Sequence, residues 1–279
     1  MAKNLSPAAA PKRQRGRPRG PATAIEAGSV QSLDRAVGLL KLVAAANGLS
    51  LTELAQQSGL APSTAYRMLT TLQAHGLLEF GEAEQLWFIG LETFRMGSAF
   101  LRRRKLAEQG RSVIQALMAD SGETANLAVA AEDGVVFVSQ VETHEAIRAF
   151  FRPGTRSEYH CSGVGKAILA HLAPRALEAA LGRQRLVAHT PKTRTTRAAL
   201  AEDLAAIRLR GFSVDDEERH LGMRCVAAAV FDENGEPVGG VSVSGPTVRL
   251  DDGRVAALGP RVAEAARQLT RAMGGRMPG

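Results

Sequence analysis

The sequence has few cysteines, few aromatic residues and no long apolar run. Cys161 and Cys225 are its only cysteines, too few for a disulfide framework or for a zinc site built from four cysteines. No apolar stretch approaches the roughly 18–20 residues that cross a bilayer, and the N-terminus lacks the apolar core of a secretory signal. We therefore expect a cytoplasmic protein with no membrane partner. Hydrophobic residues still make up 45% of the 279 residues, enough to form the cores of one or two domains.

Positive charge is concentrated at the N-terminus. Of the 35 Lys and Arg residues, six lie in residues 1–25, where there is no acidic residue, and this leaves 29 basic against 28 acidic side chains in the rest of the chain. A basic segment without a periodic apolar face cannot bury a core. Residues 1–27 are therefore predicted to form a disordered, polycationic tail.

The centre of this tail resembles the AT-hook, a short DNA-binding segment. It reads Arg15-Gly16-Arg17-Pro18-Arg19, in which glycine permits a close backbone approach and proline disfavours a helix. The resemblance implies that Arg15, Arg17 and Arg19 enter the narrow, negative minor groove of A·T-rich DNA. The alternative is a tail that only keeps the chain in solution.

Residues 28–90 have the pattern of a winged helix-turn-helix. Ser50 and Glu53 form a capping box at the start of a second helix, which ends at Gly59 in a position suited to a positive φ. A third helix begins at Pro62 and ends before Gly76, and two apolar segments around the polar residues 81–85 predict a β-hairpin wing. In the first helix, the residues at helical spacing that we expect to face inward are Leu33, Val37, Leu40 and Val43.

The third helix is the expected reader of DNA, because the second helix of such a motif enters the major groove. Ser63, Thr64 and Arg67 lie off its apolar stripe, and these side chains can bind phosphates or base edges. Tyr66 could either pack or touch DNA. The alternative is that Ser63 only caps the helix and Arg67 is a solvated surface charge.

Residues 91–109 carry a further helical pattern with the basic run 102–105, and they are predicted to form a linker helix between domains. Residues 110–279 intersperse strand and helix patterns without an internal repeat. They predict an α/β domain of about 170 residues. The expected fold class is therefore α+β, with an N-terminal winged helix-turn-helix and a C-terminal α/β domain.

Several separated motifs, in order, resemble the IclR family of bacterial transcription regulators. They are Arg35-Ala36, Ser63-Thr64-Ala65-Tyr66-Arg67-Met68-Leu69, His160-Cys161-Ser162-Gly163-Val164-Gly165-Lys166-Ala167, the segment Gly211 to Glu218, and Ser242-Val243-Ser244-Gly245-Pro246. The resemblance covers about residues 29–274 but not the basic tail. It implies operator DNA as a partner, a GAF-like effector-binding domain, and dimers that pair into tetramers.

A hairpin in the second domain indicates where an effector would bind. Asn234-Gly235 is a strong signal for a two-residue turn, which would set Glu233 opposite Glu236. The same register sets Cys225 opposite Ser244, so that a thiol and hydroxyls share one face of the sheet. Small polar side chains among small neighbours fit a small polar ligand better than a hydrophobic core.

The turn before the next helix suggests that this ligand is an anion, and Asp215 suggests that it also carries hydroxyls. The turn 162–165 leads into a helix whose free N–H groups favour a carboxylate, and Asp215 could accept hydrogen bonds from ligand hydroxyls. Small walls and one anion cradle point to an oxoacid of two or three carbons rather than an aromatic acid. The expected effector contacts are Ser162, Gly163, Asp215, Cys225, Ser242 and Ser244.

Within the family, these segments look most similar to those of glyoxylate-responsive members, including regulators of allantoin use and of the β-hydroxyaspartate cycle. The resemblance implies glyoxylate as effector, with pyruvate and glycolate as alternatives. A cysteine-dependent enzyme is the remote alternative, with Cys161 beside His160 or His171, or Cys225 beside His220, but no third orienting group is evident. No cofactor is expected, and His160, Cys161 and His220 lack the spacing of metal ligands.

Overall fold

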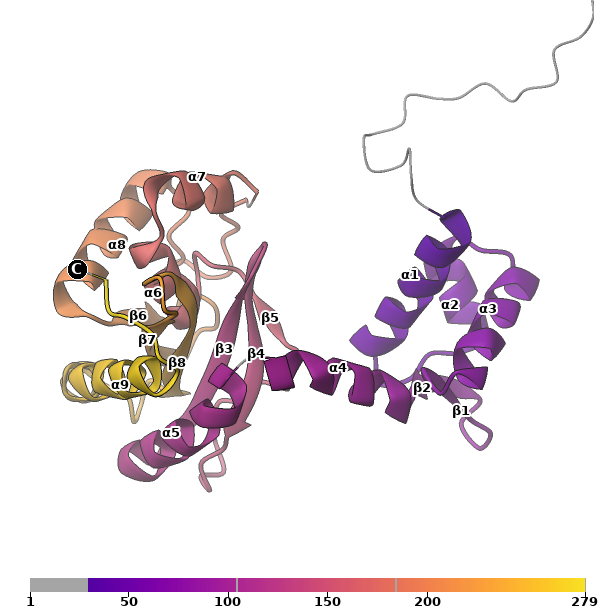
Figure 1. Cartoon of the computed structure of the whole chain (residues 1–279), viewed down its shortest axis with the longest axis horizontal. Coiled ribbons are helices and arrows are strands. Elements are labelled where there is room, and N and C mark those ends of the chain that lie inside the picture. Colours follow the sequence, from indigo (N-terminus) through magenta and orange to yellow (C-terminus); the bar gives the residue numbers. More distant parts are fainter. Residues whose placement is uncertain (1–29, 104, 184, 279) are drawn as a thin grey trace, which may run out of the picture. The chain divides into compact units, whose positions relative to one another are not determined.

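The computed structural model describes residues 30–278 except 104 and 184, and the chain divides into two compact units after Gly97 (Figure 1). The predicted basic tail of residues 1–27, with Arg15, Arg17 and Arg19, lies outside the described residues. None of the helices in the described ranges combines the length and the apolar character that a bilayer crossing requires.

The first unit is three helices followed by a two-stranded hairpin, which confirms the predicted winged helix-turn-helix. Its elements are α1 (Gln31–Ala45), α2 (Leu51–Ser58), α3 (Pro62–Ala74), β1 (Leu78–Gly81) and β2 (Leu86–Ile89). The strands pair antiparallel, and Trp87 of β2 is buried in the common core. That core consists of Leu39, Val43, Leu54, Leu69, Leu78 and Trp87.

The inward face of α1 differs in part from the prediction. Leu39 and Val43 are buried, whereas Leu33 and Val37 are 61% and 40% exposed. The helix packs through its C-terminal half, where Leu40 and Leu42 are also partly buried against the core. Leu33 and Val37 therefore belong to an apolar stripe of α1. No described residue of the unit covers the N-terminal part of that stripe.

Local sequence signals set the ends of α2 and α3. Ser50 Oγ accepts a hydrogen bond from Glu53 N, and Glu53 Oε2 accepts one from Ser50 N at 2.8 Å, so the capping box is present. Gly59 ends α2 with φ +66°, as expected. Helix α3 begins at Pro62 with Ala61 as its N-cap, so the alternative in which Ser63 only caps the helix is wrong.

The predicted linker helix over 91–109 corresponds to α4 (Leu91–Arg103) and the first turn of α5 (Lys105–Ser121). Residue 104, between them, is not described. The boundary between the two units falls within α4.

The second unit is built on an antiparallel sheet of six strands in the order β5-β4-β3-β8-β7-β6. The strands are β3 (Thr124–Ala131), β4 (Gly134–Val141), β5 (Arg156–Ser157), β6 (Ser213–Asp216), β7 (Met223–Phe231) and β8 (Pro237–Pro246). The remaining helices are α6 (Gly163–His171), α7 (Pro174–Gly182), α8 (Arg197–Arg210) and α9 (Asp252–Ala272). This is the predicted mixture of strands and helices, with two short edge strands, β5 and β6, in addition.

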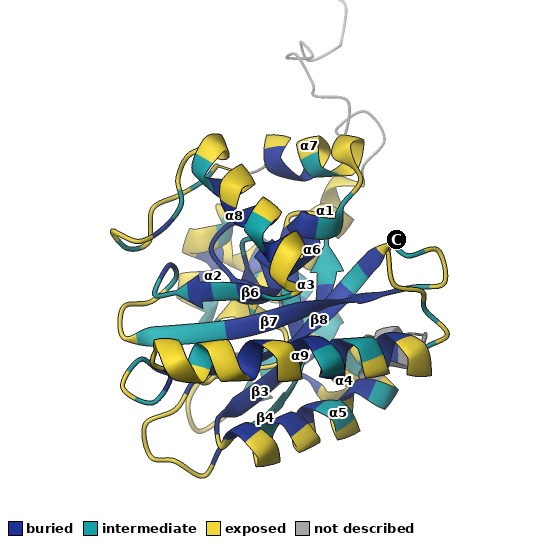
Figure 2. Cartoon of the chain, turned by 90° about the vertical axis from the view of Figure 1, so that its left-hand side faces the viewer, coloured by how far each residue is buried: buried dark blue, intermediate teal, exposed yellow. Residues whose placement is uncertain are grey.

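Helices cover both faces of the sheet, and β7 and β8 are buried along most of their length (Figure 2). On one face, Val226, Ala228 and Val230 of β7 pack in a core with α5 and α9. On the other face, Ala227 packs in a core with residues of α6 and α8. From Val226 to Val230 one face of β7 is apolar, and α6 covers the other face only in part.

In the hairpin between β7 and β8 the predicted two-residue turn is wrong, but the predicted pairing of Cys225 with Ser244 is confirmed. The turn does not set Glu233 opposite Glu236: Asp232 N instead donates to Glu236 O at 3.0 Å, and Gly235 has φ +79°. Asp232 Oδ1 accepts from the backbone N–H of both Asn234 and Glu236, which stabilises this longer loop.

A bulge then restores the predicted register. Phe231 lies opposite Pro237 and Val230 opposite Gly239, which leaves Val238 as the extra residue of β8. Beyond the bulge, Cys225 is opposite Ser244, as predicted. The one-residue shift at the turn and the extra residue in the strand cancel, so the thiol and the two hydroxyls do share one face.

Candidate functional site

The exposed face of α3 carries the predicted DNA-reading residues. Ala65 and Leu69 are buried and fix the rotation of the helix, which leaves Ser63 and Arg67 exposed. Thr64 is partly buried, and Tyr66 is 53% exposed. The tyrosine ring is therefore available to a partner rather than part of the core. The four side chains lie within the first two turns of the helix, where they could reach a DNA groove together.

The wing is acidic at its tip. Phe80 of β1 and Trp87 of β2 hold the two strands together, with ring centroids 5.0 Å apart. The turn between them presents Glu82 and Glu84 to solvent. Carboxylates repel phosphates, so the tip of this wing is poorly suited to neutralise a DNA backbone.

The second unit contains a cavity of about 210 Å³ on the α6 side of the sheet. Five of the six predicted effector contacts line it: Ser162 and Gly163 at the start of α6, Asp215 on β6, Cys225 on β7 and Ser244 on β8. Residues far apart in the sequence therefore meet in one place.

The start of α6 forms one wall of the cavity. Ser162 is the N-cap, and its Oγ accepts a hydrogen bond from Gly165 N at 2.9 Å. A Cβ on Gly163 would lie 2.8 Å from Cys225 Sγ, and one on Gly165 would lie 2.4 Å from Tyr159 O. Only glycine lets the helix start approach the sheet so closely. The first N–H groups of a helix lack intrahelical acceptors, and together with the helix dipole they favour an anion.

The opposite wall is the polar row of the sheet. Asp215 is opposite Cys225, and Cys225 is opposite Ser244. Burial, with a contribution from the nearby Glu218 carboxylate, raises the pKa of Asp215 to about 7. Asp215 Oδ1 accepts a hydrogen bond from Glu218 N at 2.8 Å. This carboxyl group is therefore partly protonated at neutral pH and can donate as well as accept hydrogen bonds.

Ser242 departs from the prediction. It lies on the same face as Ser244 but is fully buried and does not line the cavity. The amide Nδ2 of Asn126, on β3, donates to the hydroxyls of Ser242 and Ser244 at 3.5 and 3.4 Å. Asn126 thus orients the cavity hydroxyl, and its position depends on the pairing of β3 with β8, which no local signal reveals.

Aromatic and basic side chains complete the cavity, and they correct the expectation of uniformly small walls. Phe137 of β4 and Phe151 of the following loop stack with ring centroids 4.6 Å apart. Arg148, Arg219 and Arg224 also line the cavity, and each is paired with a carboxylate of this unit. The cavity combines a small polar side with an aromatic side.

A buried ion cluster lies behind α6. Lys166 is fully buried, and its Nζ donates to Asp203 Oδ2 and to the backbone O of Val214, each at 2.7 Å, and to Glu218. Arg194 donates to the same Glu218 carboxylate at 2.7 Å. The cluster ties α6, which carries the anion cradle, to the segment that carries Asp215.

Both cysteines are poor nucleophiles. Burial raises the pKa of the Cys161 thiol to about 12, and burial together with the Asp215 carboxylate raises that of Cys225 to about 11. A cysteine nucleophile reacts as the thiolate, which neither residue supplies near neutral pH. The geometry therefore speaks against the cysteine-dependent enzyme.

The two units together define the class of protein: a winged helix-turn-helix is joined in one chain to an α/β domain with a polar cavity, as in DNA-binding regulators. The chain belongs to the IclR family of bacterial transcriptional regulators, as its motifs predicted. The family model of the IclR helix-turn-helix domain matches residues 32–81, and that of the bacterial transcriptional regulator IclR C-terminal domain matches residues 98–271.

Individual relatives agree with this assignment. The chain is 51% identical over 261 residues to the HTH-type transcriptional regulator BhcR of Paracoccus denitrificans, a match that covers 92% of this chain and 94% of that protein. It is 43% identical over 266 residues to the transcriptional repressor IclR of Escherichia coli, covering 94% and 97%. The crystal structure of Thermotoga maritima IclR is similar with a TM-score of 0.73 at 28% identity, covering 88% and 99%. The chain is a DNA-binding transcriptional regulator of this family.

Proposed function

We propose that a small carboxylate binds the cavity of the second unit and changes the affinity of this regulator for its operator. Glyoxylate is the first candidate, with pyruvate and glycolate as alternatives, and the regulated genes are those of a metabolic operon. The observation that carries the proposal is the cavity itself, which brings the start of α6 opposite Asp215, Cys225 and Ser244. Ser162 and Gly163 would receive the carboxylate, and the hydroxyl and carboxyl groups opposite would bind its other oxygen.

The aromatic side of the cavity bears on the choice among acids. Glyoxylate and glycolate have no methyl group to place against Phe137 and Phe151, whereas pyruvate does. The resemblance of the segments around Asp215 and Ser244 to glyoxylate-responsive family members supports glyoxylate. Tighter binding of pyruvate would favour the argument from the aromatic side of the cavity. Tighter binding of glyoxylate would favour the argument from the resemblance.

On the DNA side, we propose that Ser63, Thr64, Tyr66 and Arg67 enter the major groove. The exposure of Ser63, Tyr66 and Arg67 on α3 supports this. The tail residues Arg15, Arg17 and Arg19 would bind the minor groove nearby, and the acidic wing makes such an additional source of positive charge more valuable.

The proposed route between the sites runs through the linker of residues 91–109, between a DNA-binding domain of residues 28–90 and an effector domain of residues 110–279. Dimers that pair into tetramers would place winged helices at a defined spacing on the operator. An effector that binds one arrangement of the effector domain better than another shifts this spacing and with it the operator affinity.

The test is operator binding measured by fluorescence anisotropy with the DNA upstream of the chain's own gene, with each acid added in turn. Ser244→Ala should raise the acid concentration needed for half the response by about two- to tenfold, because a hydrogen bond to the other oxygen of the acid is lost. Ser242 lies two residues before Ser244 on β8, outside the cavity. Ser242→Ala is therefore the matched comparison and should change the acid concentration needed for half the response less. Equal effects of the two variants, or no response to any acid, would contradict the proposed site.

A further inference from the structure

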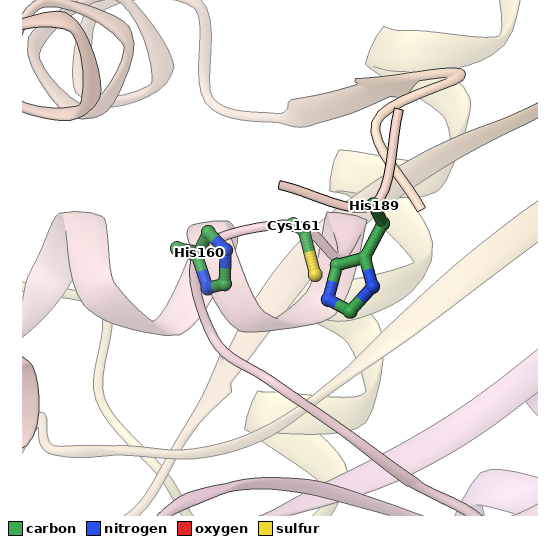
Figure 3. Close-up of side chains that lie close together, drawn as sticks. All are labelled: His160, Cys161 and His189. Atoms are coloured by element: carbon green, nitrogen blue, oxygen red, sulfur yellow. The ribbon is translucent and has the colours of Figure 1, made fainter. Parts of the chain in front are cut away.

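Three potential metal ligands converge outside the effector cavity. His160 and Cys161 precede α6, and His189 lies in the segment between α7 and α8. One ligand atom of each lies within 4.8 Å of the others. Figure 3 shows the Cys161 sulfur between the two imidazole rings. His160 and Cys161 are buried, whereas the side chain of His189 is 23% exposed.

The hydrogen bonding of His160 is that of a metal-ligating histidine. Its Nε2 lies 3.0 Å from the carbonyl oxygen of Val187, and a carbonyl can only accept, so Nε2 carries the proton. Nδ1 then holds a lone pair, and this buried nitrogen has no hydrogen-bond partner among the described residues. An unpaired buried acceptor is costly. A ligating histidine usually donates its other N–H to a carbonyl in this way, which fixes the ring with the lone pair toward the metal.

A positive charge already occupies the exposed side of the cluster. Glu158 Oε1 lies 3.5 Å from His189 Nε2, and Glu158 Oε2 lies 3.8 Å from Cys161 Sγ. Arg219 places its Nη1 2.7 Å from His189 Nε2 and donates to the same carboxylate. The guanidinium thus stands where lone pairs of an imidazole and a carboxylate converge, which is where a cation would sit.

We propose that His160, Cys161 and His189 bind one zinc ion, with Glu158 as the fourth ligand and Arg219 displaced from it. Imidazole, thiolate and carboxylate are the ligands that zinc takes in tetrahedral sites. With bond lengths of about 2.0–2.3 Å, tetrahedral ligand atoms lie roughly 3.3–3.8 Å apart. The ligand atoms of His160, Cys161 and His189, which lie within 4.8 Å of one another, must therefore close by about 1 Å, and Glu158 must approach them as well. His189, the exposed member, supplies that movement. Binding converts the Cys161 thiol to the thiolate and releases its proton to water.

The site is tested on the full-length, chelator-treated protein, titrated with Co²⁺ and then Zn²⁺ in the absence of any carboxylate effector. Co²⁺ should bind with one equivalent per chain and give the visible bands of tetrahedral cobalt together with thiolate-to-cobalt charge-transfer absorption, and Zn²⁺ should displace it. Cys161→Ser should remove the charge-transfer absorption, whereas Cys225→Ser, which changes the other cysteine, should retain it. Absence of that absorption in the unmodified protein, or its retention in Cys161→Ser, overturns the proposal.

Histidine and arginine variants provide a second readout. His189→Ala should weaken zinc binding at least tenfold, whereas the exposed His144→Ala should not. Arg219→Gln should strengthen zinc binding about tenfold, because the variant removes both the competing donor and a positive charge beside the ion. A residue that only supports the fold would weaken binding when changed, so weaker binding in Arg219→Gln also overturns the proposal.

Discussion

Asp215 on β6 lies directly opposite Cys225 on β7, and both line the cavity. Burial raises the pKa of Asp215 to about 7, and the Asp215 carboxylate adds to the effect of burial in raising the pKa of Cys225 to about 11. Below pH 7 this part of the wall is therefore close to neutral. It can face a bound carboxylate without repelling it, which an ordinary aspartate could not do.

The raised pKa of Asp215 makes the stability of the protein fall as pH rises. Below about pH 4 the carboxyl group is protonated in both the folded and the unfolded chain, and between about pH 4 and 7 only the unfolded chain ionises. Asp215→Asn removes this difference and should raise the free energy of unfolding above pH 7 by a few kcal/mol, with a smaller gain at pH 5. Urea unfolding at pH 5, 6, 7 and 8 measures the trend.

Glu264→Gln is the control for this prediction. A hydrogen bond from Arg267 lowers the pKa of the exposed Glu264 carboxylate, so its charged form is favoured in the folded chain. The variant should be no more stable than the unmodified protein at any pH. An advantage of Asp215→Asn that does not grow with pH would contradict the assignment.

Lys166 should be among the least replaceable residues of the second unit. Lys166→Met removes the cation from a fully buried site and leaves the Asp203 and Glu218 carboxylates facing each other, which should cost about 3–5 kcal/mol. Lys192→Met is the matched control: Lys192 also pairs with two carboxylates, Asp216 and Glu217, but it is 44% exposed. Its loss should cost far less than that of Lys166, because water screens an exposed ion pair. Denaturant unfolding measures both variants. A similar loss of unfolding free energy in Lys166→Met and Lys192→Met would contradict this prediction.

Arg67 should contribute directly to operator recognition. Arg67→Ala should lose about 1–3 kcal/mol of operator binding free energy, because an arginine can bind a base edge or a phosphate from the exposed face of α3. Arg175→Ala removes an exposed arginine from α7 of the second unit and serves as the control. Anisotropy titrations at one fixed salt concentration compare the two. Unchanged operator affinity in Arg67→Ala would contradict the proposal that α3 enters the major groove.

Deletion of residues 1–25 should weaken operator binding and flatten its dependence on salt. The deletion removes six positive charges, so fewer phosphates are neutralised and binding releases fewer counterions. The slope of log affinity against log salt concentration is the measurement. The same slope in the full-length and truncated chains would reduce the tail to an aid to solubility.

Local patterns predicted much of this fold. The capping box at Ser50, the positive φ of Gly59 and the helix start at Pro62 follow from nearest neighbours in the chain, and the structure has all three. Cys225 also lies opposite Ser244, as predicted. This pairing results from two deviations from the predicted hairpin, a longer turn and a bulge, whose one-residue register shifts cancel. That agreement came from compensation. Pro237, Gly239 and Gly240, which flank Val238, are residue types often found at bulges, but they do not fix which residue is the extra one.

Long-range pairings could not be predicted in this way. Asn126 meets Ser242 only because β3 pairs with β8, across more than a hundred residues. Phe151 and His189 lie in segments between regular elements, and their positions depend on how the chain returns to the sheet. Propensity and periodicity describe single elements, whereas these contacts depend on how the elements assemble.

Because of the bulge at Val238, the number of residues in this hairpin determines which face of the sheet each later side chain of β8 points to. Side chains alternate along a strand, so removing one residue between Phe231 and Val241 would turn every later position of β8 to the opposite side. Ser244 would then point toward the apolar core beneath α9, and Val243 would point to the face of the sheet that carries the polar residues. Relatives should therefore tolerate many substitutions in this hairpin, while a net change of one residue in its length would have to be balanced by a second one nearby.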